Sequence, residues 1–167
     1  QTVGIIGGTG SGKSTLVNLV PNFYSATKGQ VLIDGVNADE YDRAALLSAV
    51  SVVPQKAVLF EGTIRSNLLM GNPNASEAEL FSALETAQAA EIVRTKPNGI
   101  DEPVLRGGSN FSGGQKQRLS IARALVHGGR ILILDDSASA LDFATDAKLR
   151  AAIRKLSPAP TTFIVSQ

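Results

Sequence analysis

The chain has 167 residues, which is enough to bury one sizeable hydrophobic core and suits a single domain. Its 16 basic and 15 acidic residues give a net charge of +1, so the charge balance does not favour a nucleic-acid partner and any affinity for phosphate must be local. The absence of cysteine excludes disulfides and thiolate metal sites, and this stretch contains no signal peptide and no apolar run near the ~18 residues of a membrane span.

Hydrophobic periodicity predicts alternating strands and helices with a mostly helical middle. A glycine-rich loop follows the first strand, and a second glycine-rich stretch covers 97–110. Ser76 and Glu79 form a capping-box pattern at the start of one helix. In chain order, we expect strands at 3–6, 30–34, 50–53, 131–134 and 161–165, and helices after residue 15, at 43–49, 63–69, from 76, at 88–94, from 112 to 128 and at 141–156.

This order predicts a parallel α/β core with a helical insertion between about residues 56 and 128. The fully apolar run 131–134 ends in an aspartate, which is typical of a central parallel strand. The sequence begins and ends inside predicted strands, so we expect a piece of a longer protein.

Residues Gly7–Ser14 match the pattern G-x-x-x-x-G-K-S between a predicted strand and a predicted helix. Glycines let the loop turn its N–H groups inward, and the positive end of the helix favours an anion there. Lys13 would reach the β- and γ-phosphates of a nucleotide, and the Ser14 hydroxyl would hold Mg²⁺. A glycine-rich turn with a chance lysine is the alternative. A dinucleotide-binding loop fits poorly, because Lys13 stands where its third glycine belongs. We expect phosphate contacts from Gly8, Thr9, Gly10, Ser11, Gly12, Lys13, Ser14 and Thr15.

Asp135 ends the 131–134 strand, where a carboxylate beside a phosphate loop can hold Mg²⁺. An aspartate that only forms a turn is the alternative. Farther upstream, Ser112 is well placed to cap a long helix whose first residues are two glycines. This predicts a second anion-binding helix start, against the alternative of an ordinary capped helix. One nucleotide does not need two separate phosphate-binding sites. We therefore expect the second site to close over a nucleotide held by another chain.

Five ordered motifs resemble those of the ATP-binding cassette (ABC) ATPases. They correspond to the Walker A loop, the Q-loop, the signature, Walker B and the D-loop, and they span essentially the whole chain. Further sequence segments resemble those of exporter-type cassettes, among them 29–35, 53–55, 59–64 and 117–125. The five motifs are Gly7–Thr15, Gln55, Phe111–Gln115, Ile131–Asp136 and Ser139–Asp142.

The resemblance implies a P-loop NTPase fold: a RecA-like parallel-sheet core of about 1–55 and 129–167, with a helical subdomain of about 56–128. It implies an ATPase with ATP and Mg²⁺ as cofactors. It also implies a second cassette domain and a transmembrane domain as partners, at the cytoplasmic face of the cell membrane. Metal ligands would be Ser14, Gln55 and Asp135, and the signature contacts to a partner's ATP would come from Ser112, Gly113, Gly114 and Gln115.

Two positions depart from the family pattern in ways that weaken hydrolysis. Asp136 stands where the family carries a glutamate that polarises water, and its carboxylate sits back by about one C–C bond, ~1.5 Å. Gln167 stands where the family has a histidine, and an amide cannot take up a proton as imidazole can. We therefore expect catalytic roles for Asp136, Gln167 and Gln55 in a slow site, within one subunit of a heterodimeric exporter.

Three alternatives remain open from the sequence: a homodimer with a slow aspartate-based site, a soluble cassette ATPase acting on nucleic acid or ribosomes, and a purely regulatory ATP-binding subunit. We expect His127 to be an exposed loop residue, and Arg123 to lie on a solvated or interdomain helix face. By resemblance, the 55–67 segment contacts the membrane domain and Asp142 lies at the dimer seam.

Overall fold

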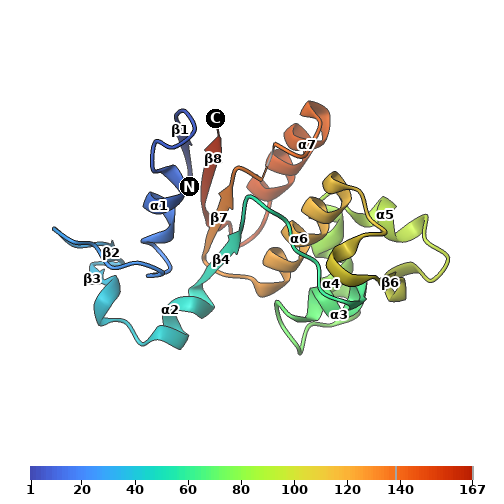
Figure 1. Cartoon of the computed structure of the whole chain (residues 1–167). Coiled ribbons are helices and arrows are strands. Elements are labelled where there is room, and N and C mark those ends of the chain that lie inside the picture. Colours follow the sequence, from blue (N-terminus) through green and yellow to red (C-terminus); the bar gives the residue numbers. More distant parts are fainter. Residues whose placement is uncertain (138, 167) are drawn as a thin grey trace.

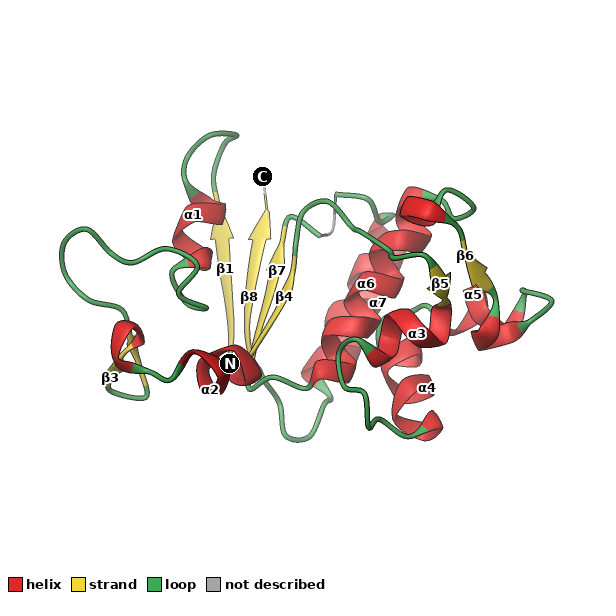
Figure 2. Ribbon diagram, turned by 60° about the horizontal axis from the view of Figure 1, so that its bottom comes forward, coloured by secondary structure: helices red, strands yellow, loops and turns green. Residues whose placement is uncertain are grey.

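The main sheet has four parallel strands in the order β1-β8-β7-β4 (Figures 1 and 2). The structure is a computed structural model that describes residues 1–137 and 139–166. The predicted α/β fold with a parallel-sheet core is confirmed. The strands are β1 (Thr2–Ile6), β4 (Val50–Val53), β7 (Ile131–Asp135) and β8 (Thr161–Ser166).

Two small antiparallel ladders lie outside the main sheet. The first pairs β2 (Leu32–Ile33) with β3 (Val36–Asn37) across the expected turn. The second pairs β5 (Gly62–Thr63) with β6 (Pro103–Val104). For the glycine-rich stretch 97–110 we expect only a loop, because a ladder of two residue pairs is too short to leave an alternating pattern in the sequence.

The helices cover both faces of the sheet, with α1 on one side and α6 and α7 on the other (Figure 2). Predicted starts are confirmed at Ser76 and Ser112, whose side chains accept from the backbone N–H groups of Glu79 and Gln115. The α-helices are α1 (Lys13–Asn18), α2 (Arg43–Ala49), α3 (Ile64–Leu69), α4 (Glu77–Thr86), α5 (Ala90–Arg94), α6 (Gly113–His127) and α7 (Phe143–Arg154), and the short 3-10 helices are η1 (Ala38–Glu40), η2 (Gly99–Asp101) and η3 (Arg106–Gly108). None of the described helices is long and apolar enough to cross a bilayer.

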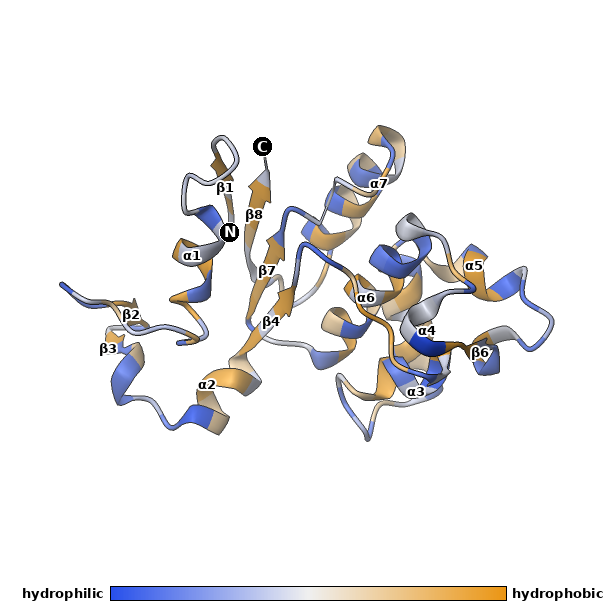
Figure 3. Cartoon of the chain, viewed as in Figure 1, coloured by the Kyte–Doolittle hydropathy of each residue, from blue (hydrophilic) through white to orange (hydrophobic). Residues whose placement is uncertain are grey.

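Strand β7 divides its side chains between two hydrophobic clusters, which is why it reads as a continuous apolar run (Figure 3). Leu132 and Leu134 belong to the large cluster formed with α3, α4, α5, α6 and α7. Ile133 belongs to the smaller cluster on the opposite face, with α1 and α2. This two-sided burial fixes the strand that ends at Asp135.

Strand β1 lies at one edge of the sheet and is less buried than the sequence predicts. Val3 and Ile5 are partly buried, whereas the side chain of Ile6 is 81% exposed. The prediction of a buried strand is wrong for Ile6, because side chains alternate between the two faces of β1 and only the face of Val3 and Ile5 is partly covered, with Ile5 packed against the smaller cluster.

Candidate functional site

A cavity of about 90 Å³ lies at the carboxyl ends of β1, β4 and β7. Its lining comes from segments far apart in the sequence that the parallel sheet brings to the same edge. Seven of the predicted site residues line it, together with Val165 of β8, which is not among the predicted site residues. The seven are Thr9, Gly10, Lys13, Ser14, Gln55, Asp135 and Asp136.

The loop between β1 and α1 begins its helix without a side-chain cap. Gly12 occupies the N-cap with a φ of 85°, a left-handed conformation that favours glycine. The Lys13 ammonium folds back over the loop and donates to the carbonyl oxygens of Gly7 at 2.6 Å and Gly8 at 2.8 Å. The loop thus holds a cation at the mouth of a helix whose first N–H groups have no capping side chain.

Ser14 and Asp135 meet across the cavity. The Ser14 hydroxyl donates to Oδ1 of Asp135 at 3.0 Å, although the residues are 121 positions apart in the sequence. Asp135 is buried by the packing of β7 on both sheet faces, whereas Ser14 is exposed. A hydroxyl and a carboxylate in contact are hard oxygen ligands of the kind that Mg²⁺ prefers, so the residues present fit that ion. No described group of three or more acidic or histidine side chains could hold a metal by itself.

Gln55 and Asp136 form a second pair on the same cavity. The Gln55 amide donates from Nε2 to Oδ2 of Asp136 at 2.9 Å. Asp136 is buried and has a φ of 47°, so its backbone adopts a left-handed conformation that is uncommon outside glycine, asparagine and aspartate. Its backbone N–H donates to the carbonyl oxygen of Val165 at 3.2 Å, which anchors the turn after β7 to β8.

The start of α6 lies apart from this cavity, whose described lining includes no residue of 111–115. The Ser112 hydroxyl accepts from the Gln115 N–H at 3.3 Å, and the Gln115 side chain accepts from the Ser112 N–H at 3.0 Å. Ser112 and Gly113 are exposed. A Cβ at Gly114 would lie 3.0 Å from the carbonyl oxygen of Ala140, so glycine permits the close approach of the 139–142 segment.

Two further predictions concern Asp142 and Gln167. Asp142 caps α7, accepting from the N–H of Thr145 at 2.9 Å and from its hydroxyl at 2.7 Å. These hydrogen bonds from the Thr145 side chain and backbone hold the pKa of Asp142 below its usual range. The predicted catalytic Gln167 lies outside the described residues.

The prediction that His127 is an exposed loop residue is wrong. His127 is the last residue of α6 and is partly buried. Its Nδ1 lies 3.2 Å from the carbonyl oxygen of Gly71, and its Nε2 lies 3.1 Å from that of Leu47. The ring therefore links the C-terminal end of α2 to the segment after α3. The isolated histidine beside Gly128 gives no sign of this in the sequence.

Comparison with known proteins gives a consistent result. Residues 1–139 match the ABC transporter family. An uncharacterized ABC transporter ATP-binding protein of Mycobacterium tuberculosis is 46% identical over 169 residues. A putative multidrug export ATP-binding/permease protein of Staphylococcus aureus is 42% identical over 166 residues. Each alignment covers 99% of this chain and 29% of the relative.

A solved structure of a bacterial Atm1-family ABC exporter with ATP bound has the same fold, with a TM-score of 0.94 and 38% sequence identity. That comparison also covers 99% of this chain and 29% of the exporter chain. The chain therefore spans less than a third of the length of the relatives that it matches.

Proposed function

The chain belongs to the ABC transporter family, and from this premise we propose that it binds Mg²⁺–ATP at an interface between two cassette domains and uses it to power export. The observation that carries the proposal is the cavity in which Lys13, Ser14 and Asp135 meet. An ammonium, a hydroxyl and a carboxylate at the mouth of an uncapped helix suit a triphosphate and its metal ion.

The chain's own residues divide the work of binding. Lys13 exchanges its two carbonyl partners in the loop for phosphate oxygens, and the loop N–H groups donate to the same anion. Ser14 and Asp135 would hold Mg²⁺, which would neutralise phosphate charge when bound. Because Gln55 donates from Nε2 to Asp136, its Oε1 would be available to accept from the attacking water or to bind the ion.

We propose that this site hydrolyses ATP slowly. Asp136 is the residue that orients the attacking water, and it is one methylene shorter than the glutamate of the family. A displacement of about 1 Å at a catalytic group can cost about 10²-fold in rate. The hydrogen bond from Gln55 holds the short carboxylate in place, which supports this proposal. Gln167 would contact the γ-phosphate as a neutral amide.

The start of α6 would complete the partner's site. Ser112 and Gly113 are exposed and do not line the cavity of their own chain, which supports a role across the subunit boundary. We propose a heterodimer in which this chain holds a largely standing ATP, while Ser112, Gly113, Gly114 and Gln115 cover the nucleotide of the faster site. Asp142, at the end of the segment packed beside Gly114, would lie at the seam between the two cassettes.

The second partner in this proposal is a membrane-embedded domain of the same transporter, with the chain at the cytoplasmic face of the cell membrane. The relative named as an ATP-binding/permease protein, of which the chain covers 29%, supports this arrangement. We propose the division into a core of about 1–55 and 129–167 and a helical subdomain of about 56–128. The grouping of α3, α4, α5 and α6 on one side supports it (Figure 1).

The test is nucleotide binding and ATP turnover by the full-length transporter. We expect the full-length subunit to bind a fluorescent ATP analogue in a Mg²⁺-dependent way. Without its partner, the subunit should hydrolyse ATP slowly. Turnover should rise when the partner subunit is present. Normal exporter-like turnover by this subunit alone would contradict the asymmetric arrangement, and a lack of nucleotide binding would contradict the whole proposal.

A further inference from the structure

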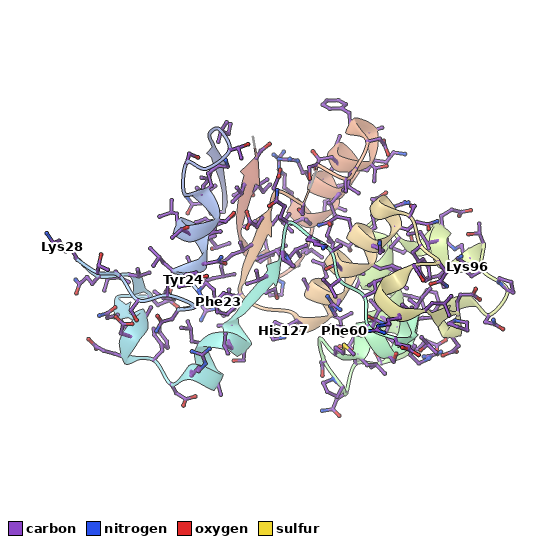
Figure 4. The ribbon with its side chains drawn as sticks, in the orientation of Figure 1. Phe23, Tyr24, Lys28, Phe60, Lys96 and His127 are labelled. Atoms are coloured by element: carbon purple, nitrogen blue, oxygen red, sulfur yellow. The ribbon has the colours of Figure 1, made fainter. Side chains whose placement is uncertain are left out.

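A cation–π pair lies directly before the start of α6. The ammonium of Lys96 lies 4.8 Å from the centre of the ring of Phe111, the residue that precedes Ser112. Lys96 follows α5 in the helical part of the chain, away from the main sheet, where Figure 4 labels it. A cation over an aromatic face is attracted by the negative potential of that face, so the pair joins the end of α5 to the entry of α6.

Phe111 sets the direction in which the chain enters α6. Its side chain is 5% exposed and belongs to the large hydrophobic cluster. Its backbone N–H donates to the carbonyl oxygen of Gly108 at 3.0 Å. The next residue, Ser112, is exposed and caps the helix. The buried ring therefore anchors one end of a short segment whose other end is open to a ligand.

Backbone hydrogen bonds hold Lys96 in place beside this ring. The Lys96 N–H donates to the carbonyl oxygen of Val93 at 3.2 Å, and the Lys96 carbonyl oxygen accepts from the N–H of Gly99 at 3.1 Å. The residue is partly buried. A long side chain that starts from a fixed backbone and lies along a surface loses less conformational entropy in keeping one contact than a fully exposed one. The ammonium is thus preorganised over the ring.

No described carboxylate draws the Lys96 ammonium away from the ring. None of the ion pairs in the described part of the chain includes Lys96. The two acidic residues that follow it most closely in the sequence have other partners. Asp101 pairs with Arg65. Glu102 accepts from the backbone and the side chain of Asn98. The aromatic ring is therefore the partner of this positive charge.

Loss of the cation–π contact would leave the entry of α6 with more than one arrangement. The hydroxyl and the N–H groups of the first turn can serve a phosphate only when they point at it together. A site that is competent for part of the time binds its ligand more weakly by that same fraction. Once the ligand is bound the geometry is unchanged, so the contact should affect the affinity for the nucleotide and leave the maximal rate as it is.

We propose that Lys96, acting through Phe111, is a positioning residue for the ATP held by the partner subunit. It keeps the entry of α6 in the arrangement in which Ser112 and the first N–H groups of the helix meet the γ-phosphate. This inference rests on the proposed function, because it requires the start of α6 to close over the partner's nucleotide. It adds a residue that lies outside all five sequence motifs.

The first test is the ATP dependence of turnover by the full-length transporter with its partner subunit. In Lys96→Met, which keeps the length of the side chain and removes its charge, the KM for ATP should rise about two- to fivefold. The kcat should change by less than about twofold. Lys96→Arg keeps a cation that stacks on the ring and should retain the unmodified KM. An unchanged KM in Lys96→Met, or an equal rise in both variants, would overturn the inference.

The second test asks whether the lysine acts through the ring. Phe111→Leu removes the aromatic face and keeps an apolar side chain, so it should raise the KM about as much as Lys96→Met does. In the double variant the KM should rise no further, because the two residues act as one unit. A KM that rises by the product of the two single effects would overturn the proposed route. Thermal melting shows that each variant is folded, and if Phe111→Leu does not fold, the comparison of Lys96→Met with Lys96→Arg decides.

Two further variants separate this inference from the proposed function. Lys155→Met, at the exposed end of α7, is the matched control and should leave the KM unchanged, and a rise equal to that of Lys96→Met would overturn the inference. Ser112→Ala reports whether the start of α6 serves the partner's site at all. A fall in turnover there with an unchanged KM in Lys96→Met overturns only the role of Lys96. Unchanged turnover in Ser112→Ala overturns the proposed role of the α6 start and this inference with it.

Discussion

Two helices of this protein begin next to glycines, and their starts are built differently. At α1, Gly12 occupies the cap position and no side chain covers the first N–H groups. At α6, Ser112 and Gln115 exchange two hydrogen bonds across the first turn. The first start is an open cradle with Lys13, Ser14 and Asp135 around it, whereas the second is satisfied by its own residues.

The difference indicates that the two starts have different partners. The α1 cradle carries its own cation and metal-binding oxygens, so it suits the full charge of a triphosphate. At the α6 start, the only cation in hydrogen-bond contact among the described residues is Arg118 of the same helix, which donates to the Gly114 carbonyl oxygen at 3.4 Å. The exposed Ser112 can offer a hydroxyl and backbone N–H groups to a phosphate that is already held elsewhere. The following predictions test this division, from the largest expected effect to the smallest.

Lys13→Ala should have the largest effect, because it removes the cation of the α1 cradle. We expect turnover by the assembled transporter to fall by about 10²–10³-fold, because without this cation the chain loses the standing ATP over which the two cassettes close. Binding of a fluorescent ATP analogue, measured by titration, should weaken as well. Lys28→Ala, in an exposed loop, is the control and should leave both unchanged; a similar fall in that variant would show that the loss is not specific to the cradle.

Ser112→Ala and Ser76→Ala form a matched pair, because both serines close capping boxes. Each substitution should lower the free energy of unfolding by about 1 kcal/mol through loss of the cap. If the Ser112 hydroxyl contacts the partner's nucleotide, only Ser112→Ala should also lower the rate of ATP hydrolysis, by about 10²-fold. The measurement is single-turnover hydrolysis by the full complex beside thermal melting of each variant. Equal turnover in the two variants would mean that Ser112 is only a cap.

Asp136→Glu tests whether the short side chain of Asp136 limits hydrolysis at the α1 site. The longer side chain reaches about 1.5 Å farther toward the attacking water, so we expect turnover to rise or stay the same. Asp136→Asn, which removes the charge and keeps the length, should give no rise. Steady-state phosphate release by the full complex measures both, and a marked fall with glutamate would contradict the assigned role.

His127→Ala should have the smallest effect, on stability rather than turnover. The ring joins the carbonyl oxygens of Leu47 and Gly71, so its loss uncouples α2 from the segment that follows α3. We expect the free energy of unfolding to fall by about 1–3 kcal/mol, because a partly buried carbonyl group loses its hydrogen-bond donor. His127→Gln keeps an amide donor, so its free energy of unfolding should lie between those of the unmodified protein and His127→Ala. Unchanged thermal melting of His127→Ala would show that the link is not stabilising.

Local sequence signals predicted the parts of the fold that depend on local chemistry. Gly12, Ser76 and Ser112 mark helix starts whose conformation follows from a few neighbouring residues. The apolar run of β7 predicted a strand buried on both faces, and the aspartate that ends it lines the phosphate-loop cavity. The family resemblance added Gln55, which nothing in its local pattern would have selected.

The features of the fold that the sequence did not predict depend on contacts between distant segments, which hydrophobic periodicity does not encode. His127 bonds groups 56 and 80 residues away. The pair β5–β6 has only two residue pairs, and the buried Asn67 reads as an ordinary polar helix residue although it fixes the Phe60 loop. The exposure of Ile6 depends on which face of β1 other elements cover, which the strand's own composition does not reveal.

The division between the two helix starts is tested most directly by a structure of the full-length, ATP-loaded transporter in its closed form. We expect Lys13 and Ser14 to contact the triphosphate held by their own chain. In the same assembly, the Ser112 hydroxyl and the N–H groups of the first turn of α6 should lie within hydrogen-bond distance of the γ-phosphate held by the partner subunit. A closed, ATP-loaded assembly in which Ser112 faces bulk solvent would contradict the account.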